Sequence, residues 1–467
     1  MKRILSLLTL CILVAGCSSN KEPQVKYVFY FIGDGMGVNQ VVGTNFYNAA
    51  NGLEKVNFSQ FPVVNFITTV SANSLVTDSS AAGSALASGV KINNSAVGVA
   101  PDGNPVSNLT EWAHAAGFVT GVATSVGVNH ATPASFVAHT DKRSSYEEIA
   151  TQMIDSPVEF MAGATFLTDR DSGHDAAYFE NLAQEAGIAV YKGPAAISNL
   201  DLSADRVVCL SAKEEDSIPY AIDRKDDDTQ LADFTDAAIR YLEARGGKKG
   251  FFVMIEGGKV DYAGHGNDAA TCFQEVNDMA KSVDLALTFL QRHPNETLIL
   301  VTADHETGGL MLGSGRYEMF PERLSRQHAS VDALTDQFRE AFFPEGKPVK
   351  TPTWDAVKAF FNEQLGMWGD VEVSERVEKE LKDVYVRTFG KEGSSLVDAN
   401  LYSVNYQLVA DVVRALDRAA GYQWSFGSHS GSPVGLYVTG ACAEEFSTVK
   451  DNAEIAPLIA KLAGYAR

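Results

Sequence analysis

The amino-acid sequence predicts an α/β fold: a three-layer sandwich with a mostly parallel central sheet, helices on both of its faces and a helical insertion. Two observations lead to this prediction. Short apolar runs rich in Val, Ile and Phe alternate along the chain with longer helical patterns, as expected for strands that are connected through helices. The chain also has 467 residues, of which 45% are hydrophobic, so it can bury a large core.

The clearest strands and helices can be assigned by residue range. Strands are expected at residues 25–32, 118–124, 251–255, 297–302 and 434–438. Helical patterns follow several of them, at residues 79–87, 146–154, 233–244 and 269–291. In sheets of this kind, ligands bind at the carboxyl ends of the strands, so candidate functional residues are expected there.

The strand pattern disappears between about residues 313 and 427. Helical patterns replace it at residues 332–341, 354–365, 373–384 and 405–420. The segment carries many charges and lies between two motifs that contain candidate functional residues. We therefore interpret it as a mainly helical insertion that forms a cap or an assembly surface rather than an independent domain.

The N-terminus has the pattern of an export signal. Basic residues 2–3 precede an apolar run at residues 4–15, which is shorter than the roughly 20 residues of a membrane-spanning helix. The sequence LVAGC, which ends in Cys17, resembles the lipobox of bacterial lipoproteins. We expect a signal peptide at residues 1–16, a membrane anchor on a lipidated Cys17, and a tether at residues 17–24. An ordinary cleaved signal is the alternative. Either way the protein is expected to be exported, to the periplasm or, as a lipoprotein, to the outer membrane.

The chain is strongly acidic, with a formal net charge of −21. Such a charge repels nucleic acid, so nucleic-acid recognition is not expected. A site that binds phosphate would have to overcome this field locally, with metal ions.

The cysteines exclude a disulfide framework. Without Cys11 and Cys17 in the N-terminal segment, the chain keeps Cys209, Cys272 and Cys442 at wide and irregular spacing. This spacing does not match a cysteine zinc motif either. We expect three buried thiols, and at most one bridge.

The first candidate motif is GDGMG at residues 33–37, directly after a predicted strand. Its glycines allow a sharp turn and leave the carboxylate of Asp34 at the strand end. Taken alone the signal is weak, because Asp-Gly is also a common turn sequence. The spacing is not that of a dinucleotide-binding loop.

The second motif is TDSSAAGSA at residues 77–85. Small residues that open a helix let a phosphate approach the backbone amides, where the helix dipole favours negative charge. Ser79, at this helix start, can attack phosphorus. An ordinary helix cap by Thr77 or Asp78 is the alternative.

The third motif is EGGKVDYAGH at residues 256–265. Asp261 and His265 are four residues apart, so on a helix their side chains share a face and can bind one ion. Glu256 ends the preceding strand. A salt-bridged surface turn is the alternative interpretation.

Two further motifs carry histidines. Asp304 and His305 follow an apolar strand, and they can share a metal only if the chain turns there, because adjacent strand residues point to opposite faces. His429 lies just before the last predicted strand and, taken alone, would be an ordinary surface residue. The joint presence of Asp or His at four strand ends and a serine at a helix start is the strong signal.

In this order the motifs resemble those of the alkaline phosphatase family. They are GDGMG, TDSSA, HATPASFVAH with a following arginine, EGGKVD with a histidine four residues after its aspartate, DHETGG and HSGS. The resemblance covers most of the catalytic domain expected at residues 25–467, except the insertion. It implies hydrolysis of phosphate monoesters to an alcohol and inorganic phosphate, through a phosphoserine intermediate, at a site with two zinc ions and one magnesium ion.

The resemblance also implies a role for each candidate residue. Ser79 is the expected nucleophile, and Arg143 is the expected clamp on two phosphate oxygens. The expected ligands of one zinc ion are Asp34, Asp304 and His305, and those of the other are Asp261, His265 and His429. The expected protein ligands of magnesium are Asp34, Thr132 and Glu256.

Two positions depart from the best-known bacterial pattern. His130 replaces an aspartate, as in animal enzymes and some cold-adapted bacterial relatives, and Tyr262 replaces a lysine. Both are expected to contact the water of the magnesium ion or the phosphate rather than a metal. The occupancy of the third metal site is therefore left open.

Two other functions are compatible with the motifs. A two-zinc phosphodiesterase of the same superfamily would use a similar core, although Arg143 would crowd the second substituent of a diester. A catalytically silent surface metal-binding protein would keep the fold without turnover. A sulfatase is disfavoured, because Ser79 is followed by Ser80 and Ala81 rather than by Pro and Arg. The expected ligands are small phosphate monoesters, and a homodimer is left open.

Overall fold

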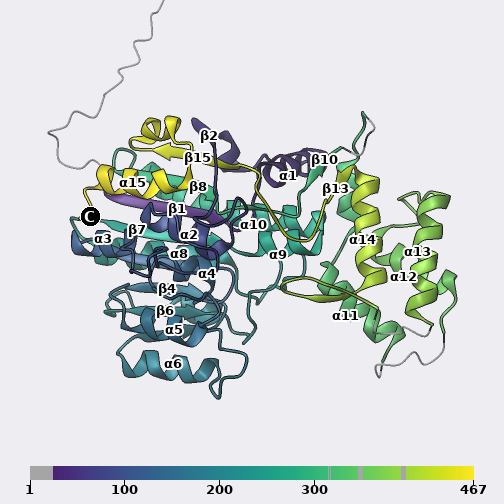
Figure 1. Ribbon diagram of the computed structural model, residues 1–467, viewed down its shortest axis with the longest axis horizontal. Coiled ribbons are helices and arrows are strands. Elements are labelled where there is room, and N and C mark those ends of the chain that lie inside the picture. Colours follow the sequence, from purple (N-terminus) through teal and green to yellow (C-terminus); the bar gives the residue numbers. More distant parts are fainter. Residues whose placement is uncertain (1–24, 314, 316, 345–350, 391–395, 467) are drawn as a thin grey trace, which may run out of the picture.

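The computed structural model describes residues 25–466, apart from residues 314, 316, 345–350 and 391–395 (Figure 1). The expected signal peptide, Cys17 and the tether lie outside the described residues. Among the helices that are described, none combines the length and the apolar character needed to cross a membrane.

A nine-stranded sheet with the order β2-β15-β8-β1-β7-β3-β4-β6-β5 forms the centre of the fold. Its strands are β1 (Tyr27–Gly33), β2 (Val63–Ile67), β3 (Val119–Thr124), β4 (Phe160–Gly163), β5 (Ala189–Lys192), β6 (Val207–Leu210), β7 (Phe251–Gly257), β8 (Thr297–Ala303) and β15 (Val434–Gly440). All neighbouring strands are parallel except β15, which is antiparallel to β8 and β2. The predicted mostly parallel sheet is confirmed.

Helices cover both faces of this sheet (Figure 1). Outside residues 313–427 they are α1 (Val38–Ala50), α2 (Ser79–Ser88), α3 (Leu109–Ala115), α4 (Ala131–Ala134), α5 (Tyr146–Asp155), α6 (Ala176–Glu185), α7 (Pro194–Ser198), α8 (Leu231–Gly246), α9 (Lys259–Gly266), α10 (Ala269–Arg292) and α15 (Ile455–Ala463). Short 3-10 helices add η1 (Asn57–Gln60), η4 (Ala443–Thr448) and η5 (Asn452–Glu454).

Side-chain alternation along β1 explains the three layers. Phe29 points to one face, where its ring lies 5.3 Å from that of Phe289 on α10. Tyr30, the next residue, points to the other face, where its ring lies 6.0 Å from that of Phe136, just after α4. Because successive strand residues alternate between faces, a strand that is apolar at every position must be covered on both sides. All residues of β1 after Tyr27 are buried, which confirms the predicted sandwich.

The five expected strands correspond to β1, β3, β7, β8 and β15, and the four expected helices to α2, α5, α8 and α10. Strands β2, β4, β5 and β6 were not predicted. Each has only four or five residues, and runs of that length do not show a period that separates them from loops.

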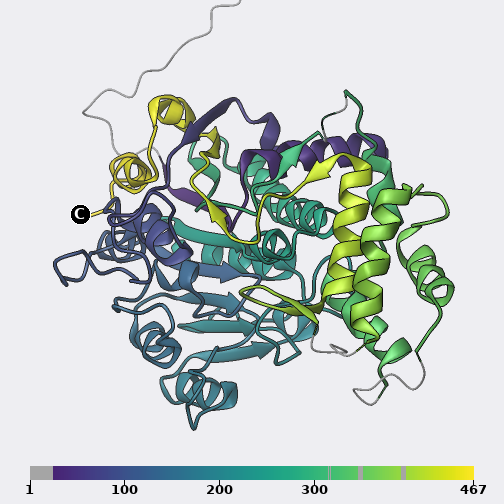
Figure 2. The same ribbon diagram turned by 45° about the vertical axis from the view of Figure 1, so that its right-hand side comes forward.

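The segment 313–427 is mainly helical, as expected, and lies to the right of the sheet in Figure 2. It contains η2 (Pro321–Arg326), α11 (Val331–Phe342), α12 (Trp354–Leu365), α13 (Glu375–Thr388), β11 (Val397–Ala399), β12 (Val404–Tyr406), α14 (Gln407–Ala420) and β13 (Tyr422–Gln423). Its helices pack around Phe338, whose ring lies within 6.0 Å of those of Phe361, Phe389 and Tyr406. The β11–β12 hairpin was not predicted, and the role of the segment as a cap or an assembly surface stays a prediction.

The three cysteines are buried, as expected, and Cys209 and Cys272 are free thiols. Cys209 lies on β6 and Cys272 on α10. Burial raises the pKa of Cys209 to about 12, so this thiol stays protonated at neutral pH and is chemically inert.

The register of the central strands aligns their carboxyl ends. Gly33 at the end of β1 is level with Gly257 on β7 and with Ala303 on β8. Thr124 at the end of β3 is level with Glu256. The residues that follow these strands therefore meet at one edge of the sheet, which is where ligands bind in such folds.

Phe29→Ala tests the central position of β1 in the core. The ring also lies 5.2 Å from that of Phe251, so its removal leaves a cavity between the sheet and α10. We expect the free energy of unfolding, measured in guanidinium titrations, to fall by about 3–5 kcal/mol. The control is Phe66→Ala on the edge strand β2, where the side chain is 54% exposed, and a change of no more than about 0.5 kcal/mol is expected there. Equal losses in the two variants would contradict this account of the core.

Candidate active site

Ser79 is the first residue of α2, and its position follows from the local sequence. The Asp78 carboxylate caps the helix by accepting a hydrogen bond from the Ala81 amide at 3.0 Å. All ten residues of α2 are buried, and all except Leu86 are small, so neighbouring elements can pack closely around the helix. The Ser79 Oγ lies 3.2 Å from Nε2 of His305. The helix cap at Asp78, which was the alternative interpretation of this motif, is thus present, and the hydroxyl of the next residue, Ser79, lies beside the candidate metal ligand His305.

Asp34, Asp304 and His305 form the first candidate metal group, with ligand atoms that lie within 4.8 Å of one another. Nε2 of His305 is 3.4 Å from Oδ1 of Asp34 and 3.3 Å from Oδ2 of Asp304. Strand β8 ends at Ala303, so the chain turns before these residues, as the sharing of one ion requires. All three side chains are fully buried.

The turn of the GDGMG motif makes room for this group. Gly35 has a φ of +69°, and a Cβ there would lie 2.8 Å from the Cα of Asp261 and from the Thr307 Oγ1. Its backbone N–H donates to Oδ1 of Asp304 at 3.1 Å. Only glycine fits this conformation and this close approach.

Asp261, His265 and His429 form the second candidate metal group. Asp261 and His265 lie on α9, and Oδ2 of Asp261 is 3.3 Å from Nε2 of His265. Nδ1 of His265 contacts the Gly427 carbonyl at 2.8 Å, and Nδ1 of His429 contacts the Thr77 carbonyl at 3.0 Å. These backbone contacts fix both rings, so the two Nε2 atoms face each other at 3.2 Å.

A third group consists of Asp34, His130 and Glu256. From the sequence, we expected Thr132 rather than His130 to be the third ligand beside Asp34 and Glu256. Thr132 is also buried, and its hydroxyl makes no hydrogen bond with the described residues. His130, expected to contact only water or phosphate, therefore presents a ligand atom to the same position as the two carboxylates.

Buried carboxylate oxygens in these groups have no hydrogen-bond partner among the described residues. They are Oδ1 and Oδ2 of Asp34, Oε1 of Glu256, Oδ2 of Asp261 and Oδ2 of Asp304. Carboxylate oxygens left without donors in a protein interior are costly, and a bound cation removes that cost. The donor set of imidazole nitrogens and carboxylate oxygens fits zinc, and the oxygen-rich third group also offers ligands for magnesium.

Electrostatics lead to the same interpretation. Burial, together with the neighbouring carboxylates, raises the pKa of Glu256 to about 7 and that of Asp304 to about 8, and raises the pKa of Asp34 well above its usual value. For Asp261 burial has the same tendency, but three histidines outweigh it and hold its pKa below the usual value. Burial and His429 lower the pKa of His305, which keeps its ring neutral and able to bind a cation.

Arg143 lies at the side of Ser79 and the third group. Its guanidinium is 3.5 Å from Oδ2 of Asp78 and 3.4 Å from Nε2 of His130. Its backbone is fixed by a hydrogen bond to the Ser95 carbonyl at 2.7 Å. Because both guanidinium contacts are long, its N–H groups can also bind an anion that enters between the candidate metal groups.

The structure adds Thr307, Glu306 and Tyr402 to the site residues that the sequence indicated. The Thr307 hydroxyl donates to Oδ1 of Asp261 and lies 3.2 Å from Nδ1 of His305, so it connects the first two groups. Tyr402 comes from the segment 313–427, and its ring stacks on Tyr262 with a centroid distance of 3.6 Å. Glu306 and Thr307 stand inside the DHETGG motif, where a hydrogen-bonding role could have been suspected, whereas no sequence signal indicated Tyr402.

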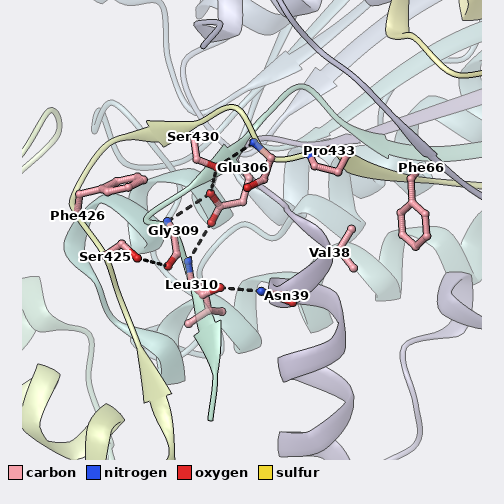
Figure 3. Close-up of a pocket in the computed structure, with 11 residues that line it drawn as sticks. Val38, Asn39, Phe66, Glu306, Gly309, Leu310, Ser425, Phe426, Ser430 and Pro433 are labelled. Atoms are coloured by element: carbon pink, nitrogen blue, oxygen red, sulfur yellow. Dashed lines mark hydrogen bonds between the residues drawn. The ribbon is translucent and has the colours of Figure 1, made fainter. Parts of the chain in front are cut away.

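Glu306 fixes the backbone that carries His305 and His429. Strand β9 (Glu306–Thr307) pairs with β14 (His429–Ser430), and β10 (Met311–Leu312) follows it. The buried Glu306 carboxylate accepts from the backbone N–H groups of Gly309 and Leu310 and from the Ser430 hydroxyl (Figure 3). It also accepts from Gln40 Nε2 at 2.9 Å. One side chain thereby joins α1, the turn after β9, and β14.

A pocket of about 620 Å³ lies beside Glu306 and Ser430. Phe66 and Phe426 also line it, and Figure 3 shows them on opposite sides of Glu306. In β14, Ser430 and His429 are adjacent and so point to opposite sides of the strand pair. The pocket therefore lies on the other side of the β9–β14 pair from the candidate metal groups. It is not where a ligand of those groups would bind.

Glu306→Gln tests the role of this carboxylate. An amide presents one acceptor oxygen in place of two, so at least one of the buried donors loses its partner. We expect the free energy of unfolding to fall by about 1–3 kcal/mol in guanidinium titrations. Glu318→Gln, at an exposed position after β10, is the matched control and should leave stability unchanged. If the Glu306→Gln variant is as stable as the wild type, the Glu306 carboxylate does not stabilise this part of the site.

Comparisons with known proteins agree with this architecture. The family model described as alkaline phosphatase matches residues 25–162 and 182–465. The match runs through the segment 313–427, which the sequence motifs had left outside the resemblance, and omits residues 163–181.

Curated relatives and solved structures give the same picture. Alkaline phosphatase 4 of Bacillus subtilis is 27% identical over 454 residues, which cover 96% of this chain and 91% of the relative. Alkaline phosphatase 3 of the same organism is 28% identical, with 95% of this chain and 90% of the relative covered. The crystal structure of a cold-active alkaline phosphatase from a psychrophilic Shewanella species superposes with a TM-score of 0.77 at 26% identity, and covers 94% of this chain and 99% of that one. Because the family model matches more than half of the sequence and the fold agrees, this chain belongs to the alkaline phosphatase family.

Proposed function

We propose that this protein hydrolyses phosphate monoesters to an alcohol and inorganic phosphate, with Ser79 as the nucleophile. One observation carries the proposal. The buried Ser79 Oγ lies 3.2 Å from His305, at the point where carboxylates and imidazoles from separate strand ends converge. Membership of the alkaline phosphatase family supports the reaction type.

We propose that the groups hold two zinc ions and one magnesium ion. Asp34, Asp304 and His305 would bind one zinc ion, and Asp261, His265 and His429 the other. Asp34, Thr132 and Glu256 would provide oxygens to magnesium, and the His130 imidazole beside them is the ligand type that would favour zinc there instead. Bound in these places, the ions would act as Lewis acids and lower the pKa of a coordinated hydroxyl or water.

The proposed covalent chemistry is a double displacement at phosphorus. Ser79 Oγ attacks the phosphorus atom, the bond to the ester oxygen breaks, and the alcohol leaves with the proton that the serine gives up. Water then attacks the phosphoserine, which releases inorganic phosphate and restores the Ser79 hydroxyl. Each displacement inverts the configuration at phosphorus, so the whole reaction proceeds with retention.

Residues around Ser79 suit the charge of this substrate. The N-terminus of α2 presents backbone N–H groups and the positive end of the helix dipole next to the nucleophile. Arg143 can bind two non-bridging oxygens of the phosphoryl group, and its planar fork matches their geometry. In a monoester none of these oxygens carries a substituent, whereas in a diester one of them does. This difference favours the monoesterase over the phosphodiesterase.

A paired ester assay tests the proposal directly. Protein loaded with zinc and magnesium is offered p-nitrophenyl phosphate and bis(p-nitrophenyl) phosphate under the same conditions. We expect a kcat/KM for the monoester at least about 100-fold higher, equivalent to about 2.7 kcal/mol of transition-state binding. Equal or faster diester hydrolysis would support the phosphodiesterase. Absence of turnover on both esters, with metals bound, would identify a silent metal-binding protein.

Ser79→Ala separates nucleophile from metal ligand. We expect the variant to form no phosphoenzyme after labelling with radioactive monoester and acid quenching, and to lose at least about 1,000-fold in kcat. Its zinc content should stay at the wild-type level, because the carboxylates and imidazoles hold the ions without the serine. Ser88→Ala, at the other end of the same buried helix, is the control and should keep labelling and activity. Loss of zinc in the Ser79 variant would show that its role is structural.

A further inference from the structure

Tyr402 reaches the candidate site from a hairpin whose turn is fixed by hydrogen bonds. It lies between β11 and β12, which pair antiparallel. The Asn400 carboxamide oxygen accepts from the backbone N–H of Tyr402 at 2.9 Å and from that of Ser403 at 2.8 Å. Asn405 ties the hairpin to α11 through a hydrogen bond to Asp332 at 2.9 Å. The backbone of Tyr402 is therefore held in place before any ligand binds.

The ring of Tyr402 lies between the second and third candidate metal groups. It stacks on Tyr262 at 3.6 Å with an interplanar angle of 17°, and its centroid is 5.3 Å from that of His265 and 6.3 Å from that of His130. Tyr262 in turn has the Lys259 amino group 5.7 Å from its ring. The stack on Tyr262 leaves the tyrosine ring little freedom to turn away from the site.

The hydroxyl of Tyr402 is the feature without a structural explanation. It is buried and makes no hydrogen bond with the residues that the structure describes. Buried tyrosine hydroxyls normally have a partner, and the phenol is a donor at neutral pH. Its charged neighbours are Asp261, Arg143 and Asp34, which belong to the region where the phosphoryl group of a monoester would lie. A non-bridging oxygen of a doubly charged phosphoryl group is a strong acceptor that could bind in this region.

We propose that Tyr402 is a substrate-binding residue whose Oη donates a hydrogen bond to a phosphoryl oxygen of the bound monoester. The inference rests on the proposed phosphatase function and adds a neutral donor to the charged clamp at Arg143. It also gives the segment 313–427 a direct part in substrate binding. A tyrosine that served only as packing for Tyr262 would not need its hydroxyl.

Tyr402→Phe tests this proposal, because the variant keeps the ring stack and removes only the hydroxyl. The control is Tyr406→Phe on the same hairpin, where the ring packs on Phe343 at 5.2 Å inside the segment. The measurements are the inhibition constant and the calorimetric dissociation constant of inorganic phosphate, the KM and kcat for p-nitrophenyl phosphate, and the zinc content. For Tyr402→Phe we expect phosphate binding to weaken by about tenfold or more, with KM raised and zinc content unchanged. Tyr406→Phe should match the wild type.

The outcomes separate this inference from the proposed function. A wild-type protein that neither binds phosphate nor hydrolyses the monoester would overturn the proposed function itself. A working wild type with an unchanged Tyr402→Phe variant would overturn only the role of Tyr402. Tyr402→Ala separates the ring from the hydroxyl. If Tyr402→Ala binds phosphate more weakly than the wild type while Tyr402→Phe does not, only the packing of the ring matters and the hydroxyl has no role. Loss of zinc from Tyr402→Phe would also contradict the proposal.

Discussion

Repulsion between buried carboxylates at one edge of the sheet is the constraint on which the rest of the structure depends. Asp34 and Asp304 directly follow β1 and β8, Glu256 is the last residue but one of the neighbouring β7, and all three side chains are fully buried. Two such charges about 4 Å apart repel each other by about 4 kcal/mol at an effective dielectric constant of about 20. The strands that carry them are apolar on both faces, so the core supplies the stability that offsets this cost. A cation bound between the carboxylates would remove this repulsion, so the repulsion favours metal binding.

The groups that meet these carboxylates are held by backbone rather than by one another. The rings of His265 and His429 are fixed by the carbonyls of Gly427 and Thr77, and the Glu306 carboxylate binds the backbone of the turn next to His305. A site arranged in this way keeps its geometry when a ligand leaves, because the contacts that orient each ring do not involve the ligand. Preorganisation of this kind lowers the cost of binding a phosphoryl group.

Much of this arrangement could be predicted from the sequence. The parts that could not be predicted were missed for one physical reason. Strand ends and the α9 pair Asp261 and His265 are local patterns, and they were predicted correctly. The position of His130 beside Asp34 and Glu256, by contrast, depends on how the β3 loop folds over the edge of the sheet, which no local period encodes. Tyr402 was missed for the same reason, since its hairpin is short and lies in a segment with helical periodicity. The roles of these residues stay predictions, although their positions are now known.

The position of Tyr402 links the mainly helical segment to the chemistry at the edge of the sheet. Its hairpin continues through β12 into Tyr406, which packs in the same aromatic cluster as Phe338. The stack of Tyr402 on Tyr262 then connects that cluster to α9, which holds Asp261 and His265. Packed aromatic side chains resist small displacements, because close-packed interiors have few voids to absorb them. Packed aromatic rings therefore connect the segment 313–427 to α9, and the proposed hydrogen bond from Tyr402 to the substrate would depend on this connection.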